Sequence, residues 1–538
     1  MNPIDWLAAS KHPKHRHVGG VYGSMDHKEQ AMVDFNGGWR RRGTLGRLAV
    51  ATLATAMGGS LPATRALAAQ PAGAVAQGSP AAPVAQGAME QMGAGFWQTV
   101  VAKPAERPAL IQRFFSPGIR ERRGEAGLQE TFSMLAEALG SELATARPTE
   151  LKGNAREGEL IYTLAGGRRV ALMLTLTGEN PALIERFGVR PLPPKVAALK
   201  PAQLPAAIDA RLRAEAQAGR FSGAVLVARG EQLIHAGAVG LADRRSGRRN
   251  TVDTPFNLGS INKMFTAIAI AQLQAAGKLD WHDTVGRHLP NFPNAKIREQ
   301  VTIHQLLTHR SGVGSYWNET HDKQRATLDS QQAFLQTFVD QPLLFEPGTR
   351  TEYSNGGVVI LGLIIEALSG KDYYRYIREH LYQPAGMRKA EHFRRDDRQA
   401  GFALGYIKTE DGAWQDHLDG LSLRGSAAGG GYASVRDLQA FARALQQERL
   451  LPRAQLETLW KPRERFGPLG YGYLFTVGDS AGKRWVGHNG GAPGISAEFL
   501  FYPDDGLVIA VLANQDHAAE AMREWLHAQV EASLFTRP

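Results

Sequence analysis

Residues 204–535 begin and end with patterns typical of paired β-strands, and this arrangement limits the folds open to the chain. At the start, F-S-G-A-V-L-V-A-R and Q-L-I-H-A-G-A-V-G flank a turn at Gly230-Glu231. At the end, A-E-F-L-F-Y and G-L-V-I-A-V-L-A-N flank Asp504-Asp505-Gly506, and a helical pattern follows over 518–534. The sequence therefore predicts an α/β (α+β) fold with one antiparallel sheet, whose halves are separated in sequence by a helical region.

The first 69 residues have the features of a leader with an export signal. A basic stretch, W-R-R-R-G, precedes a mildly apolar run and the small-residue pattern Ala66-Leu67-Ala68. Arg41-Arg42 is compatible with a twin-arginine signal, and an ordinary Sec signal is an equal alternative. Because Arg47 and Gly58-Gly59 interrupt the apolar run, we expect no stable membrane span. The prediction is cleavage after Ala68 or Ala69 and export to the periplasm.

A linker and a small folded module separate the leader from the strand-bounded region. Residues 70–87 contain only Ala, Pro, Gly, Gln, Val and Ser, which predicts a disordered linker over 70–90. Helical patterns around 108–115 and 128–139 and two strand patterns flanking Ala165-Gly166-Gly167 predict a small α+β module over 91–190. Pro191-Leu192-Pro193-Pro194 marks its end, and its role is unassigned.

The composition argues against nucleic acid as a partner. Residues 1–69 hold nine Lys or Arg and four Asp or Glu, so half of the net charge of +10 lies in the leader. The rest is spread without a basic stripe or interleaved aromatic residues. The chain has no cysteine, which excludes a thiolate nucleophile and any Cys-ligated metal. His304 and His309 are five residues apart and lack a third ligand in a usual pattern, so we expect neither a metal nor a cofactor.

Ser260-Ile261-Asn262-Lys263 is an S-x-x-K element at the start of an apolar helical pattern. The i, i+3 spacing places both side chains on one helix face. A serine near a helix N-terminus lies in a field that favours an oxyanion, and a desolvated lysine can lose its proton near neutral pH. Alone, the four residues are more often an N-capping serine and a solvated lysine than a catalytic pair.

Tyr353-Ser354-Asn355 stands between the turn-forming F-E-P-G-T-R-T-E and the apolar helical run V-V-I-L-G-L-I-I-E-A-L. A tyrosine projecting from such a loop can transfer protons if cations lower its pKa. The amide of Asn355 can hold both Lys263 and a substrate carbonyl. In isolation, a buried aromatic residue and an N-cap are the better explanation of the pattern.

His488-Asn489-Gly490-Gly491 heads a glycine-rich segment just before the final strand pair. Because glycine has no side chain, a substrate can lie against this backbone. The amide of Gly491 is then a candidate partner of the Ser260 amide in an oxyanion hole. The alternative is a tight turn with an incidental histidine.

In their order and setting, these three elements resemble those of the serine beta-lactamase and penicillin-binding-protein superfamily. The resemblance is strongest to class C beta-lactamase-like hydrolases and family VIII esterases. It covers about 204–535 and includes T-I-H-Q-L-L-T-H-R-S-G-V-G (302–314), Y-Q-P-A-G-M (382–387) and A-A-G-G-G-Y-A-S-V-R-D-L (427–438). We assign residues 200–538 to this hydrolase domain. The resemblance implies an all-helical lobe beside the sheet, with the active site between them.

The resemblance also implies acyl transfer through a Ser260 ester, with Lys263 and Tyr353 as proton-transfer partners. Asn355, His488, Asn489, Gly490 and Gly491 are the implied substrate-binding residues. The substrate is a small molecule or peptide containing an ester or amide, such as a D-amino-acid peptide.

The chain departs from the family at the third element, where class C beta-lactamases have K-T-G and this chain has His488. Imidazole titrates near pH 6.5 when unperturbed, so the sequence predicts a cation that exists only at low pH. We therefore expect a poor beta-lactamase whose residual action on carboxylate-bearing substrates rises as His488 becomes protonated. A sensor or scaffold that acylates without turnover, and a true class C beta-lactamase, are the alternatives; the oligomeric state is not assigned.

Overall fold

The computed structural model describes residues 83–535, except for 140–142, 144–145, 165–168, 179–180, 193, 398–400, 410–411 and 467–468. The leader, residues 70–82 of the predicted linker and the turn at 165–167 lie outside the described residues. Among the helices of the described part, none is both long and apolar enough to cross a membrane.

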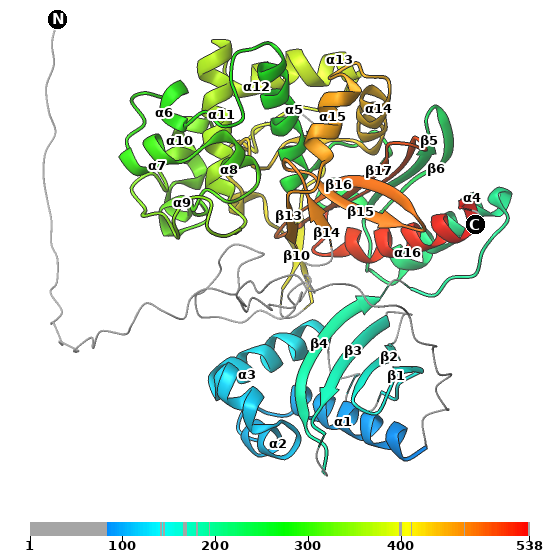
Figure 1. The fold of residues 1–538 in the computed structure, drawn as a ribbon. Helices are drawn as coiled ribbons and strands as arrows, with labels where there is room; N and C mark the ends of the chain where they lie inside the picture. The colour runs from blue at the N-terminus through cyan, green and yellow to red at the C-terminus, as the bar shows by residue number, and fades with distance from the viewer. Residues whose placement is uncertain are drawn as a thin grey trace, which may run out of the picture. The chain divides into compact units, whose positions relative to one another are not determined.

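The N-terminal module packs helices on an antiparallel sheet (Figure 1). Its helices are α1 (Pro83–Val101), α2 (Arg107–Phe114) and α3 (Pro117–Leu139). Its strands lie in the order β1 (Glu150–Gly153), β2 (Glu157–Thr163), β3 (Arg169–Leu176) and β4 (Ile184–Leu192). Four phenylalanine rings meet in the core of this module. They are Phe96 of α1, Phe115 just after α2, Phe132 of α3 and Phe187 of β4.

Helix α1 begins inside the predicted linker, so the boundary at residue 90 is wrong. Two glycines that follow the predicted linker are packing positions of this helix. A β-carbon on Gly93 would lie 2.8 Å from the Tyr162 hydroxyl, and one on Gly95 would lie 2.5 Å from a ring carbon of Phe114. Small residues here let the helix approach its neighbours closely. Strand β4 likewise continues through Pro191 to Leu192, beyond the predicted end at 190.

The domain over residues 200–538 is built around an antiparallel sheet in the order β13-β14-β15-β16-β17-β18-β5-β6. The C-terminal strands are β13 (Glu464–Phe466), β14 (Leu469–Tyr471), β15 (Thr476–Ser480), β16 (Lys483–Ala492), β17 (Ile495–Tyr502) and β18 (Leu507–Ala513). The N-terminal pair is β5 (Gly223–Arg229) and β6 (Gln232–Val239). Strand β18 pairs with β5, from Leu507 opposite Arg229 to Ala513 opposite Gly223. The predicted joining of the two ends in one sheet is confirmed.

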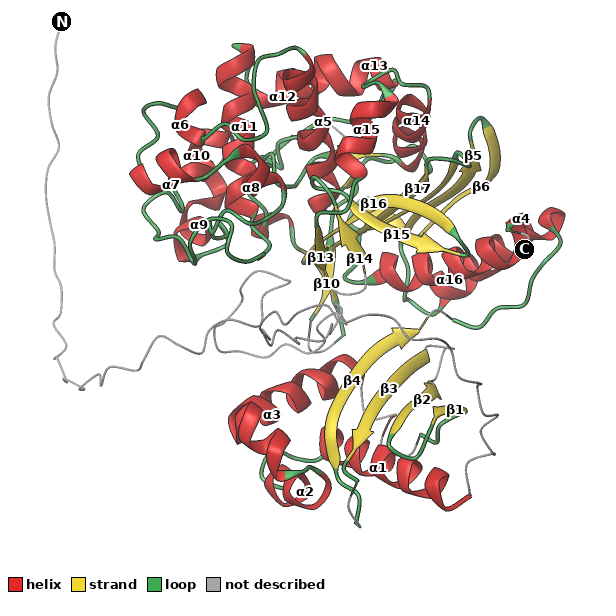
Figure 2. Ribbon diagram, viewed as in Figure 1, coloured by secondary structure: helices red, strands yellow, loops and turns green. Residues whose placement is uncertain are grey.

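Two layers of helices cover this sheet (Figure 2). On one face, α4 (Leu204–Gln217) and α16 (Ala518–Leu534) bury the alternate residues of β5, β17 and β18. The helical region covers the other face and shares one large core with it. Its helices are α5 (Asn262–Ala275), α6 (Val285–His288), α7 (Ala295–Gln300), α8 (Ile303–Leu307), α9 (Glu319–Gln324), α10 (Gln331–Leu335), α11 (Asn355–Ser369), α12 (Tyr373–Ile377), α13 (Gln383–Ala385), α14 (Val435–Gln446) and α15 (Arg453–Trp460). Short strands β7 (Leu241–Asp243), β8 (Arg248–Arg249), β9 (Phe256–Asn257), β10 (Tyr406–Lys408), β11 (Trp414–Asp416) and β12 (Tyr432–Ala433) pair in the connecting loops.

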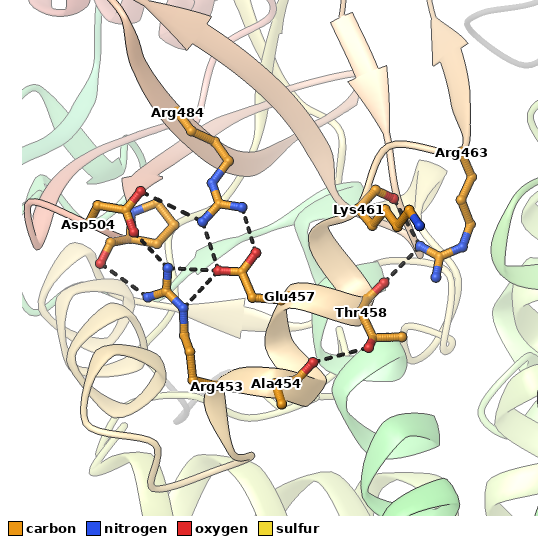
Figure 3. A network of polar contacts seen from close by, with 9 residues as sticks. Arg453, Ala454, Glu457, Thr458, Lys461, Arg463, Arg484 and Asp504 are labelled. Carbon is orange, nitrogen blue, oxygen red and sulfur yellow. Dashed lines mark hydrogen bonds and ion pairs between the residues drawn. The ribbon is translucent and has the colours of Figure 1, made fainter.

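A network of ion pairs joins α15 to the strands that carry the third sequence element (Figure 3). Arg484 of β16 makes two hydrogen bonds, of 2.6 and 2.8 Å, to the carboxylate of Glu457 on α15. Arg453 bridges Glu457 and Asp504, each at 2.7 Å, and Asp504 belongs to the turn between β17 and β18. The network holds one end of β16 against the helical layer, and the other end of β16 approaches Ser260.

Candidate active site

Ser260 lies in a single 3₁₀ turn, Gly259–Ile261, that leads directly into α5. Gly259 has φ 50°, a left-handed conformation that favours glycine. A β-carbon at Gly259 would also lie 2.8 Å from the Gly491 nitrogen, so a larger residue has no room there. The tight turn therefore brings Ser260 against strand β16 at the first turn of a helix that the sequence predicted.

Lys263 lies one helical turn after Ser260 and is fully buried. Its Nζ is 3.0 Å from Ser260 Oγ, 2.8 Å from Asn355 Oδ1 and 2.5 Å from the carbonyl oxygen of Ala428. Burial lowers the pKa of Lys263 well below its ordinary value of 10.5.

Because burial lowers the pKa of Lys263, burial favours the uncharged amine, which has two N–H donors and one lone pair. Asn355 Oδ1 and the Ala428 carbonyl only accept, so they take the two donors. The lone pair then faces the hydroxyl of Ser260, which is the arrangement of a general base and its nucleophile.

Tyr353 hydrogen-bonds Ser260 from the other side of the site, and its ring centroid lies 4.8 Å from Lys263 Nζ. Burial raises the pKa of its phenol, and the hydrogen bond with Ser260 opposes that rise only in part. The condition stated for Tyr353, that nearby cations lower its pKa, is not met, because the neighbouring lysine and histidines have lowered pKa values of their own. Tyr353 is therefore a phenol that donates a proton, and not a phenolate.

Asn355 is the first residue of α11, and Ser354 caps that helix by accepting the Gly357 amide hydrogen at 2.8 Å. The Asn355 side chain reaches Lys263 with its oxygen and Ser315 Oγ, at 3.4 Å, with its nitrogen. The predicted contact between Asn355 and Lys263 is present in the structure.

Gly490 and Gly491 bring the backbone of β16 against the nucleophile. A β-carbon on Gly490 would lie 2.0 Å from the Leu258 carbonyl oxygen and 2.8 Å from the Ser260 nitrogen. One on Gly491 would meet only the Ile495 carbonyl oxygen, at 3.8 Å. The chain therefore passes Ser260 closely at Gly490 and has open space beside Gly491, where an oxyanion hole with the Ser260 amide was predicted.

His488 and Asn489 do not have the surroundings expected of them. His488 is 5% exposed, and both of its ring nitrogens have protein partners. Burial lowers its pKa to about 3, so the predicted protonation near pH 6.5 is wrong. Asn489 is exposed and stands opposite Glu498 of β17; strand alternation places its side chain on the other face of the sheet from His488.

Sequence reasoning missed two buried side chains beside the site, His309 and Tyr471. The ring of His309 lies 4.5 Å from that of Tyr353, and Tyr471 hydrogen-bonds both His309 and His488. His309 belongs to the T-H-R-S-G stretch that carried part of the resemblance, and this was the available signal. Tyr471 has no comparable signal, because it lies 162 residues from His309 in the sequence.

Comparison with known proteins places this site in a known family. A family model described as Beta-lactamase matches residues 206–533. The chain belongs to the beta-lactamase family. Penicillin-binding protein 4* of Bacillus subtilis is 32% identical over 344 residues, which cover 59% of this chain and 73% of that relative. Esterase EstB of Burkholderia gladioli is 34% identical over 215 residues, covering 37% of this chain and 54% of EstB.

A penicillin-binding protein from Bacillus halodurans has the same fold as the hydrolase domain. Its crystal structure superposes with a TM-score of 0.55 at 34% identity and covers 59% of this chain and 98% of that chain. The beta-lactamase family is one of serine hydrolases, and the antiparallel sheet with its helical lobe is the family's fold. The predicted fold and family are both confirmed.

Proposed function

We propose that this chain is a serine hydrolase in which Ser260 attacks an ester or amide carbonyl and forms an acyl-enzyme. The observation that carries the proposal is the buried Lys263, whose Nζ lies 3.0 Å from Ser260 Oγ and also contacts the acceptors of Asn355 and Ala428, and whose pKa is lowered by burial. In the uncharged form of Lys263, the direction toward Ser260 is left for accepting a proton.

In acylation, Ser260 Oγ forms a bond to the carbonyl carbon and its proton moves to Lys263 Nζ. The amides of Ser260 and Gly491 donate to the developing oxyanion. The bond to the leaving group then breaks, and the leaving group takes the Tyr353 proton, which Lys263 replaces. In deacylation, a water molecule takes the place of the leaving group and the same proton transfers run in reverse, which releases the acid and restores Ser260. Positioned proton transfer of this kind contributes roughly 10²–10⁴-fold to the rate.

The proposed substrates are esters or D-amino-acid peptides rather than beta-lactams. A lysine in K-T-G presents a cation to a substrate carboxylate, whereas His488 is buried and uncharged. A charge-assisted hydrogen bond is worth roughly 1.5–3 kcal/mol, so its loss weakens recognition of penicillins and cephalosporins. The name of the relative EstB is consistent with an ester substrate.

The test is the turnover of short-chain nitrophenyl esters, D-amino-acid amides and a cephalosporin by the purified full chain. We expect the ester kcat/KM to exceed that for the cephalosporin, and Ser260→Ala to abolish both activities. Ser246→Ala, at an exposed turn position, is the matched control and should behave as wild type. Efficient cephalosporin turnover would contradict the substrate class, and activity in Ser260→Ala would contradict the mechanism.

We also propose that residues 1–69 direct export and are removed near Ala68-Ala69. The support is the basic, mildly apolar and A-L-A sequence of 39–69.

A further inference from the structure

Three buried side chains form a hydrogen-bonded row beside Tyr353. His309 Nε2 lies 3.2 Å from the Tyr471 hydroxyl, which lies 3.0 Å from His488 Nε2. His309, Tyr471 and His488 are 0%, 3% and 5% exposed, so water does not compete for these contacts. The residues come from the loop after α8, from β14 and from β16.

The partners at each end of the row fix which atom donates in each hydrogen bond, and either end alone is enough to do so. At one end, the Ser354 amide donates to His309 Nδ1 at 3.1 Å, so a neutral His309 carries its hydrogen on Nε2 and donates to Tyr471. At the other end, His488 Nδ1 is 2.6 Å from the Asn489 carbonyl oxygen, which only accepts. A neutral His488 therefore accepts at Nε2, and the single hydroxyl hydrogen of Tyr471 serves it. Both ends give the same arrangement.

The row also holds the loop that carries Tyr353. The Glu352 amide donates to the His309 carbonyl oxygen at 2.9 Å, and the Ser354 amide donates to the His309 ring. The residues on both sides of Tyr353 are thus bound to one histidine, whose ring also packs on Tyr353. His309 itself has φ 58°, a conformation that costs a non-glycine residue energy and that these contacts offset.

We propose that Tyr471 is a positioning residue that fixes His309 and His488 as uncharged imidazoles in single tautomers. By doing so, it orients Tyr353 and keeps a cation out of the part of the cleft where the family recognises carboxylates. This specificity role rests on the proposed hydrolase function. With Tyr471 donating to His488 Nε2, neither ring nitrogen of His488 offers a hydrogen to substrate.

The charged and titratable groups around the row act in the same direction. Burial is the largest cause of the lowered pKa of both histidines, and a protonated Lys263 would lower both values further. Tyr353 also lies beside the row, and burial keeps it protonated. Tyr471 is also protonated, because burial raises its pKa. Removing the Tyr471 hydroxyl leaves the Nε2 hydrogen of His309 and the Nε2 acceptor of His488 unpaired. The tautomer of His488 is then no longer fixed.

The first test is the ¹⁵N NMR spectrum of histidine-labelled full chain, with His309→Gln and His488→Asn used to assign the signals. We expect His309 to carry its hydrogen on Nε2 and His488 to carry it on Nδ1, with neither titrating between pH 5 and 9. A hydrogen on Nε2 of His488, or a charged imidazole in this range, overturns the proposal. This result does not depend on turnover, so it stands apart from any failure of the hydrolase assignment.

The second test compares Tyr471→Phe with Tyr473→Phe, which removes the hydroxyl that contacts His304 Nδ1 at 2.8 Å in the same segment. For Tyr471→Phe, we expect kcat on a neutral ester to fall about tenfold with KM nearly unchanged, because Tyr353 is less well oriented. We also expect the ratio of kcat/KM for a carboxylate-bearing ester to that for the neutral ester to rise as the pH falls from 9 to 5. Tyr473→Phe should match wild type in both measurements. Identical pH profiles for the two variants contradict a specific role for Tyr471.

Discussion

Adding one methyl group at Gly490 or at the adjacent Gly491 should have very different effects. In Gly490→Ala, the new β-carbon would lie 2.0 Å from the Leu258 carbonyl oxygen and 2.8 Å from the Ser260 nitrogen. Both contacts are to backbone, so no side chain can rotate away, and β16 and the Ser260 turn must separate by about 1 Å. We expect a loss of roughly 1–3 kcal/mol in the free energy of unfolding. A displacement of this size at reacting groups costs about 10²-fold in kcat.

Gly491→Ala is the matched control for the fold. Its β-carbon would meet only the Ile495 carbonyl oxygen at 3.8 Å, so stability should change by no more than about 0.5 kcal/mol. The assays are urea unfolding and kcat/KM on a nitrophenyl ester for both variants. Equal stability of the two variants, or near-wild-type activity in Gly490→Ala, would refute the close approach of β16 to Ser260 as the basis of the site.

Three further predictions concern the base, a half-buried acid and export. Lys263→Met should lower ester kcat by roughly 10²–10⁴-fold, and Lys263→Arg should not restore the activity because a guanidinium keeps its proton. Neither loss should add to the loss caused by Ser260→Ala, because the two residues act as a unit. Rescue of activity by arginine would argue against a neutral base. Burial and then Glu498 raise the pKa of Glu520 to about 7, above its ordinary 4.5, so the folded state holds the extra proton and stability should fall as pH rises from about 4.5 to 7. Urea midpoints of Glu520→Gln should lack this slope, and an unchanged slope would contradict the assignment. Mass spectrometry of periplasmic protein should find an N-terminus at or near Ala69, whereas an uncleaved chain in the cytoplasm would disprove export.

The sequence was sufficient for the sheet and for three of the site's side chains because local patterns encode them. The S-x-x-K spacing fixes Ser260 and Lys263 on one helical turn, and Asn355 follows from a helix start. The pairing of β18 with β5 followed from strand patterns at both ends of the domain. The side chains depend on neighbours in sequence, and the sheet depends on the rule that strand pairs at the two ends of a domain join in one sheet.

What the sequence did not reveal depends on burial and on contacts distant in the chain. The ionisation of His488 is set mainly by its burial, which cannot be read from H-N-G-G. The role of Tyr471 arises from two histidines on different elements. The start of helix α1 was missed because residues 83–87 have the Pro, Val, Ala, Gln and Gly composition that commonly marks linkers.

The central claim is that Ser260 becomes acylated with Lys263 as its uncharged base, and the most direct measurement is mass spectrometry after reaction with a fluorophosphonate. Wild-type chain should gain a single adduct that peptide mapping places on Ser260, at a rate that falls as Lys263 is protonated at low pH. Lys263→Met should react far more slowly, and Ser260→Ala should gain no adduct. An adduct on another residue, or undiminished labelling of Ser260→Ala, would contradict the account.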